Sequence, residues 1–301
     1  MINPRLIKKR LSSVKNIGKI TKALEMVSAS KVQKLTEKAL NAKPYAKLIY
    51  ELVGNLAGDS EAMEVTLMKQ PEKIESELYI LISTNRGLAG SLNTNLFRNL
   101  SKHLGGNNLK HNFITIGKKG RSFALLNGNL VADFSDYKEK TDIVSSVNKI
   151  IVDGFIDGTY DAVYIVYSDF ITALTQEPSV KRILPIEKSE LTSEQMETEI
   201  KGRRETESEK LIKGKRSFHY EPDPVTVMES LLPYYLEIQL VESLYEAEAS
   251  EHASRMIAMK NASDNSDELS FGLSLEYNKG RQSLITTEIS DITTAQASLG
   301  H

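Results

Sequence analysis

Residues 225–298 read VTVMESLLPYYLEIQLVESLYEAEASEHASRMIAMKNASDNSDELSFGLSLEYNKGRQSLITTEISDITTAQAS, with no proline after Pro233. Apolar residues recur in this segment at spacings of three and four, which is the period of an α-helix with one buried face. Such a helix would be longer than about 100 Å, several times the diameter of a small domain. It therefore has to pack lengthwise on another element. The residues that set the period are Val225, Met228, Leu232, Leu236, Leu240, Leu244, Met256, Met259, Leu284, Ile285, Ile289 and Ile292.

The first fifty-odd residues of the chain are the expected partner. Residues 3–56 are predicted to form one helix, in which Pro4 suits the first turn. Pro44 is expected to kink or divide this helix, because a proline inside a helix removes one backbone hydrogen bond. The predicted buried stripe consists of Ile7, Leu11, Val14, Ile17, Ile20, Leu24 and Val27, and then of Leu48, Leu52 and Leu56.

The two end segments carry opposite charges. Residues 1–40 hold ten Lys and Arg against two Glu, whereas residues 225–301 hold twelve Asp and Glu against four Lys and Arg. The pattern predicts an antiparallel coiled coil whose flanking charges attract. Each exposed ion pair stabilises by only about 0–1 kcal/mol, so burial of the apolar stripes has to hold the helices together. A solvated helix surface is the alternative interpretation of the basic face. A nucleic-acid arm is disfavoured, because no aromatic residue interleaves the basic ones.

The composition excludes several classes of protein. The 301 residues include no cysteine, so disulfides and thiolate metal sites are excluded. The net charge of −2 argues against a general nucleic-acid binder. No apolar run is long enough to span a membrane, and the N-terminus lacks the apolar core of a signal peptide. The expectation is a soluble protein of a reducing compartment.

The central part of the chain changes to the period of strands alternating with helices. Strands are predicted at 78–83, 113–116, 130–134, 162–167 and 180–186, with helices at 91–104, after 117–120 and at 142–154. This order is typical of βαβ units. The predicted fold class is α/β with long helical extensions: an antiparallel coiled coil of the terminal helices and an inserted Rossmann-like α/β domain with a mainly parallel sheet. The expected divisions are residues 1–57, 77–186, a charged loop or linker at 187–224, and 225–301.

The chain offers little evidence of chemistry of its own. The turn Thr84-Asn85-Arg86-Gly87-Leu88-Ala89-Gly90 follows a strand, yet its G-x-x-G spacing lacks the full dinucleotide motif. A tight strand-to-helix connection is therefore favoured over a phosphate site. The five histidines have no metal-ligand spacing, and the sequence has no G-x-S-x-G or H-E-x-x-H motif. We expect no catalytic residue, no cofactor and no metal ion.

Three blocks of sequence resemble the gamma subunit of F-type ATP synthases. The first is KITKALEMVSASK at 19–31, and the second is STNRGLAGSLN at 83–93. The third runs along the tail, from EHASRM at 251–256 through AMKNA at 258–262 to ITTEI at 285–289. The blocks occur in order over nearly the whole chain, which makes the resemblance specific.

The resemblance implies a non-catalytic rotor subunit. The coiled coil would be the central shaft inside a ring of alpha and beta subunits. The α/β domain would lie near the epsilon subunit and the membrane-embedded ring of c subunits. Ion flow would turn the shaft, and the shaft would hold the three beta subunits in different nucleotide states. One copy per complex is expected, attached peripherally to the inner face of the cell membrane, with no cofactor and no nucleic acid.

The same resemblance places contact residues on both helices. Leu24 stands where the family usually has methionine, near an acidic loop of the beta subunits, and Lys19 and Lys22 lie close enough to face that loop. Further along the shaft, the positions that meet the surrounding ring are Arg281, Gln282, Thr286 and Glu288. Gly272 and Gly280 would each cost about 1 kcal/mol of helix stability, which predicts local flexibility. A nucleotide-binding α/β enzyme and a generic coiled-coil adaptor are the alternative functions.

Overall fold

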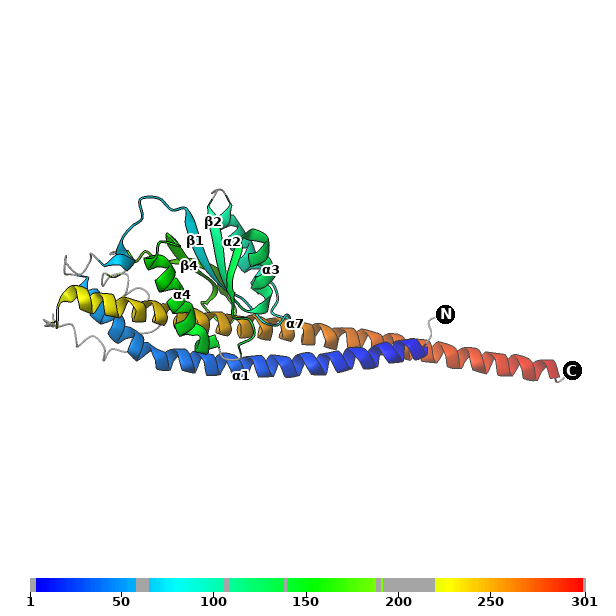
Figure 1. Ribbon diagram of the computed structural model, residues 1–301. Coiled ribbons are helices and arrows are strands. Elements are labelled where there is room, and N and C mark those ends of the chain that lie inside the picture. Colours follow the sequence, from blue (N-terminus) through cyan, green and yellow to red (C-terminus); the bar gives the residue numbers. More distant parts are fainter. Residues whose placement is uncertain are drawn as a thin grey trace. The chain divides into compact units, whose positions relative to one another are not determined.

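The computed structural model describes residues 4–57, 65–105, 109–137, 140–187, 191 and 220–299. Most of the predicted charged loop or linker at 187–224 lies outside the described residues. The chain forms two compact units, each built from separate parts of the sequence. The helical unit contains residues 1–31 and 252–301, and the α/β unit contains residues 32–251. The predicted fold class is confirmed, because long N- and C-terminal helices flank a mainly parallel sheet (Figure 1).

Two long helices account for both ends of the chain. Helix α1 (Pro4–Leu56) continues through Pro44, so it is not divided there. Helix α7 (Pro224–Leu299) begins at a proline in its first turn, directly after a capping residue. The Asp223 carboxylate accepts the backbone N–H of Thr226 at 2.9 Å and the Thr226 hydroxyl at 2.7 Å. These bonds lower the pKa of the Asp223 carboxyl. The cap therefore contributes stability above the ordinary carboxyl pKa, and the contribution is lost as pH falls through the lowered value.

The contact between α1 and α7 in the helical unit follows a different register from the predicted stripe. Gly18, Thr21 and Ser28 are buried, whereas the exposed fractions of Ile17, Ile20 and Val27 are 53%, 60% and 55%. The prediction for these three apolar residues was therefore wrong. It was also wrong for other stripe residues that are exposed: Leu48 of α1, and Leu284, Ile285, Ile289 and Ile292 of α7. A heptad alternates steps of three and four residues, whereas the predicted stripe took several steps of three in a row. Each step of three falls about 60° short of a full turn, so repeated threes move off the contact face.

Small residues bring the two helices close together. A Cβ placed on Gly18 would lie 3.2 Å from the Cβ of Ser266. The Thr21 hydroxyl donates to the carbonyls of Ile17 and Gly18 at 3.1 and 3.0 Å, so its polar atom is satisfied within its own helix. The helices run antiparallel in this unit, as predicted (Figure 1). We call the contact between α1 and α7 in the helical unit the seam. The seam is narrow and partly polar, and it buries fewer apolar residues than the sequence pattern suggested.

The two glycines that suggested local flexibility both lie within α7. A Cβ on Gly272 would meet no atom within 4 Å. We therefore expect Gly272→Ala to stabilise the protein by about 0.5–1 kcal/mol, because alanine loses less backbone entropy in a helix. Urea unfolding followed by circular dichroism measures this gain. A loss of stability would show that the glycine is needed at this position.

The α/β unit is built on one five-stranded sheet in the order β3-β2-β1-β4-β5. Strands β1 to β4 are parallel, and β5 pairs with β4 in antiparallel fashion. All of the predicted strands and helices of this region are present. The strands are β1 (Ser76–Ile82), β2 (Lys110–Ile116), β3 (Asn129–Asp133), β4 (Ala162–Phe170) and β5 (Gln176–Leu184). The helices are α2 (Leu92–Leu104), α3 (Lys118–Asn127) and α4 (Val144–Ile156), with short 3₁₀ turns at Thr66–Met68 and Lys140–Ile143.

Side chains alternate between two cores on opposite faces of the sheet. Leu78, Ile80 and Ile82 of β1 face a core shared with α4 and with the parts of α1 and α7 that belong to this unit. Tyr79 and Leu81 face the second core, under α2 and α3. Figure 1 shows these layers. No helix in the described part of the chain is long and apolar enough to cross a membrane.

Candidate functional site

The C-terminal end of α7 is a long exposed helical surface. Since Gly18 lies opposite Ser266 and the helices are antiparallel, Pro4 falls opposite about residue 280. Every residue from 281 to 296 is exposed. Figure 1 shows α7 continuing past the first residues of α1. We call residues 281–296 the tip.

The tip carries an apolar stripe on an otherwise polar helix. Leu284, Ile285, Ile289 and Ile292 are 46%, 44%, 56% and 65% exposed. Three of them, Ile285, Ile289 and Ile292, follow helical spacing and share one side. A contiguous apolar surface of this kind marks a contact site for another molecule.

The four predicted contact residues of the tip lie around this stripe. Arg281, Gln282, Thr286 and Glu288 are all exposed. The Thr286 hydroxyl donates to the Gln282 carbonyl at 2.9 Å, so it is partly committed to its own helix. Arg281 and Glu288 lie two turns apart and therefore point to nearly the same side of α7.

The predicted contact residues of α1 form a separate group. Lys19 is exposed and Leu24 is half-buried. The Lys22 ammonium lies 3.0 Å from the Glu25 carboxylate, so its charge is shared with its own helix. At 1.5 Å per residue, Lys19 lies about 25–35 Å along the helices from the predicted contact residues of the tip, Arg281 to Glu288. The two groups of predicted contact residues therefore lie in separate regions of the helical unit, and the structure does not bring them together.

Sequence reasoning missed a set of outward apolar residues on α1. Ile17, Ile20 and Val27 were assigned to the buried stripe, and Met26 was assigned no role. All four are more than half exposed, and they lie beside Lys19 and Lys22. Strict heptad alternation from Ile7 would have placed Gly18, Thr21 and Ser28 inside, leaving these residues to contact another molecule.

The glutamates of α7 make defined contacts within the α/β unit. The buried Lys140 ammonium lies 3.8 Å from a carboxylate oxygen of both Glu248 and Glu251. The Tyr50 hydroxyl donates to Glu242 at 2.7 Å, and the Ser145 hydroxyl donates to Glu237 at 2.9 Å. The acidic charge of α7 therefore helps to attach the α/β fold to this helix. The charge pattern of the sequence alone predicts attraction to the basic N-terminal helix instead.

Lys140→Met tests this attachment. We expect the free energy of unfolding to fall by about 2–3 kcal/mol, because two partly buried carboxylates lose their cation. Urea unfolding measures the change, and Lys149→Met, at an exposed lysine of α4, is the matched control. In a Glu251→Gln background, Lys140→Met should lower the free energy of unfolding by less than it does in the wild-type protein. Equal losses in the two backgrounds would refute a direct interaction.

The turn at 84–90 is closed by its own hydrogen bonds. The Asn93 side chain accepts the Thr84 N–H at 3.3 Å and donates to the Thr84 hydroxyl at 2.7 Å. The Thr84 hydroxyl donates to the Arg86 carbonyl at 2.8 Å. These bonds support a tight connection between β1 and α2. Among the described residues, no three His, Asp or Glu side chains are grouped to hold a metal ion.

Comparison with protein families and sequences gives consistent matches along the whole chain. The ATP synthase family model matches residues 3–299. The ATP synthase gamma chain of Roseiflexus castenholzii is 39% identical over 99% of this chain and 99% of the relative. The ATP synthase gamma chain of Xanthomonas oryzae pv. oryzae is 35% identical over 99% of this chain and 100% of the relative.

Solved structures share the fold. The rotor of the Euglena gracilis mitochondrial ATP synthase includes a chain that aligns with a TM-score of 0.59 and 19% identity, covering 94% of this chain and 98% of that one. A second Euglena gracilis structure, of the OSCP, F1 and c-ring parts, gives a TM-score of 0.64 and 21% identity, covering 98% and 94%. At these identities the similarity establishes the fold.

Proposed function

The chain belongs to the ATP synthase gamma-chain family, and we propose from this premise that it is the central-stalk rotor subunit of an F-type ATP synthase. The observation that carries the proposal is the antiparallel helix pair with its exposed tip, in a chain matched from end to end by gamma chains. A helix pair of this kind has its contact surfaces on the outside. Surrounding subunits can therefore contact different side chains at different angles of the pair.

In the proposed mechanism, the helix pair selects among conformations of the catalytic beta subunits. The surface of the pair differs from side to side at one level of the shaft. Near Gly18 and Ser266, α1 carries the exposed Lys19 and Lys22, whereas α7 carries the exposed Asp264, Asp267 and Glu268. At any angle, the three beta subunits therefore meet different side chains. Differential contact is what shifts a conformational equilibrium, so rotation would take each beta subunit in turn through its nucleotide states.

The proposed contacts are divided between two regions of the helical unit. Lys19, Lys22 and Leu24 would face the acidic loops of the beta subunits. Arg281, Gln282, Thr286 and Glu288 would meet the alpha and beta ring around the tip, together with the apolar stripe. The outward residues Ile17, Ile20, Met26 and Val27 extend the first region.

The α/β unit would contact the epsilon subunit and the ring of c subunits. Two solved structures with the same fold include the c-ring: one is of the central stalk and c-ring of the Tetrahymena thermophila mitochondrial ATP synthase, and the other is of OSCP, F1 and the c-ring from Euglena gracilis. In this proposal residues 77–186 form the inserted domain, between the terminal helical segments 1–57 and 225–301. Proton flow through the membrane part would turn the subunit.

The chain itself would be non-catalytic, with the chemistry carried by the beta and alpha subunits. What supports this is the closed turn at 84–90 and the lack of a metal-ligand group in the described part of the chain. Association with the membrane would be peripheral, at the inner face, through the c-subunit ring.

Reconstitution tests the proposed function. Mixed with alpha and beta subunits of the same organism, the full chain should give a complex that contains one copy of the chain and sustains ATP hydrolysis. Subunit stoichiometry by native mass spectrometry and a coupled ATPase assay provide the measurements. Hydrolysis that is the same with and without the chain, and no incorporation of the chain into the complex, would reject the proposal.

A further inference from the structure

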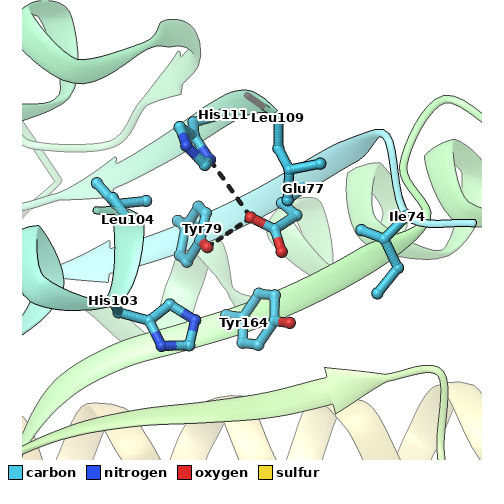
Figure 2. Close-up of a pocket in the computed structure, with 8 residues that line it drawn as sticks. All are labelled: Ile74, Glu77, Tyr79, His103, Leu104, Leu109, His111 and Tyr164. Atoms are coloured by element: carbon cyan, nitrogen blue, oxygen red, sulfur yellow. Dashed lines mark hydrogen bonds and ion pairs between the residues drawn. The ribbon is translucent and has the colours of Figure 1, made fainter. Parts of the chain in front are cut away.

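A pocket of about 320 Å³ opens in the α/β unit. It lies on the face of the sheet covered by α2, near the amino ends of three parallel strands. Glu77 and Tyr79 come from β1, His111 from β2 and Tyr164 from β4, and His103 comes from the last turn of α2. Figure 2 shows these side chains converging. The volume is within the range of small-ligand sites, and the rotor function gives this pocket no task.

The centre of the pocket is the buried carboxylate of Glu77, which is only 6% exposed. One of its oxygens, Oε2, accepts the Tyr79 hydroxyl at 2.7 Å and lies 3.3 Å from Nδ1 of His111. The other oxygen, Oε1, points toward the side of the pocket where Ile74 and Tyr164 lie (Figure 2). One oxygen of the Glu77 carboxylate is thus engaged by Tyr79 and His111. The other lies on the side of Tyr164, whose side chain also interacts with the carboxylate.

The charge on Glu77 lacks a permanent counter-ion in the described part of the chain. Its ion-pair partner there is His111, and histidine carries a charge only in part of the physiological pH range. A carboxylate withdrawn from water costs several kcal/mol unless a cation or several hydrogen bonds compensate it. The site is therefore better completed by an added positive charge.

Aromatic rings form the walls beside this carboxylate. The rings of Tyr79 and Tyr164 are stacked, with centroids 5.1 Å apart and planes 13° apart. The His103 ring meets Tyr164 edge-on at 5.2 Å and Tyr79 at 6.0 Å. Burial, followed by interaction with Glu77, raises the pKa of both Tyr79 and Tyr164, so both phenols stay neutral at physiological pH. Aromatic rings next to a carboxylate are a combination that attracts organic cations.

We propose that this pocket binds the head group of an organic cation, an alkylammonium or a guanidinium, by hydrogen bonds to Oε1 of Glu77 and by contact with Tyr164. Ile74, Leu104 and Leu109 on the pocket wall cover the alkyl part of the ligand. We do not propose a metal ion as the ligand, since no three metal-ligating side chains lie together among the described residues. The ligand class is a cation of the kind carried by polyamines and by lysine and arginine side chains.

The test is nuclear magnetic resonance of the full chain with two probes of similar shape, methylguanidinium chloride and neutral methylurea. We expect methylguanidinium to shift the ring signals of His103 and His111 to saturation, and methylurea to leave them unchanged. Glu77→Gln should weaken binding about tenfold or more, because a charge-assisted hydrogen bond is lost. Glu75→Gln should have no effect, because this exposed carboxylate is paired with Lys73.

A second variant keeps the test decisive if Glu77→Gln fails to fold. Leu104→Trp fills the pocket without removing the carboxylate, and it should abolish the methylguanidinium response. The proposal is overturned if methylurea gives the same response as methylguanidinium. It is also overturned if the response survives in a folded Glu77→Gln or Leu104→Trp variant, or if methylguanidinium gives no saturable shift.

The reconstituted complex distinguishes the two sources of the ligand. If a lysine or arginine side chain of a neighbouring subunit fills the pocket, methylguanidinium will bind the isolated chain and will be excluded from the complex. If the natural ligand is a free small molecule, the probe will bind both. Either result supports the cation site, and neither depends on whether the chain rotates.

Discussion

A chain that ends at Gly280 will fold with the wild-type stability and will support ion-driven ATP synthesis about tenfold more slowly than the full-length chain. The fold should be unaffected because residues 281–296 are all exposed. The function should suffer because the apolar stripe and the four proposed tip contacts are removed together. Thermal unfolding of the isolated chain and ATP synthesis by the reconstituted complex provide the two measurements.

Side-chain variants of the full-length tip locate the cause. Replacing Leu284, Ile285, Ile289 and Ile292 together by alanine keeps the helix, since alanine is the best helix former, and should reproduce most of the loss in synthesis. The matched control replaces Thr287 and Ser290 by alanine, because both are exposed polar positions of the same segment. A truncated chain that couples at the wild-type rate would show that the tip is not a contact surface.

A disulfide formed in the double variant Gly18→Cys/Ser266→Cys will raise the free energy of unfolding of the helical unit by about 3–5 kcal/mol, because it closes a loop of roughly 250 residues. A Cβ on Gly18 would lie 3.2 Å from that of Ser266, and a disulfide requires about 3.5–4.5 Å. A shift of a few tenths of an ångström is thus sufficient. The chain has no cysteine of its own, so the product is unambiguous.

The control for this pair is Ile17→Cys/Ser266→Cys. Ile17 precedes Gly18 directly and faces outward, so this pair should not form the intramolecular bond. Gel mobility without reductant and urea unfolding with and without reductant measure the two outcomes. Efficient disulfide formation in the Ile17 variant, and not in the Gly18 variant, would contradict the register of the seam.

The sequence predicted the architecture well because two patterns were clear: the helical spacing of three and four residues at both ends of the chain, and the apolar runs of the strands between them. Tyr79 and Leu81 alternate with Leu78, Ile80 and Ile82 between two covered faces of the sheet, which gives β1 a continuous apolar run typical of a buried parallel strand. Asp223 and Pro224 also form a recognisable helix start. These signals depend only on neighbouring residues and on burial within the fold, so they do not change with the partners that the folded protein contacts.

The seam of the helical unit could not be predicted in the same way. Sequence reasoning assumes that apolar residues point inward, and here Ile17, Ile20 and Val27 point outward while Gly18, Thr21 and Ser28 are buried. A helix that must contact partners on its outer face carries apolar residues on both sides, so hydrophobicity alone no longer marks the seam. Residue size and strict heptad spacing are the better signals for such a helix.

For the candidate contact residues, the sequence predicted which positions are involved but not the contacts that their side chains make. Lys19 and the tip residues Arg281, Gln282 and Glu288 are exposed as the proposed contact role requires, but the partners proposed for them are on other chains. The ion pair of Lys22 with Glu25 and the contacts of Lys140 depend on rotamers and on the packing of distant segments, which a single sequence does not specify.

Rotation of single reconstituted complexes, with a bead attached to this chain and the Gly18→Cys/Ser266→Cys pair oxidised, is the most direct test that the paired helices turn as one body. The predicted result is ATP-driven rotation at the same rate before and after reduction. Rotation that stops on oxidation and resumes on reduction would mean that the two helices must move against each other, and that result would contradict the account.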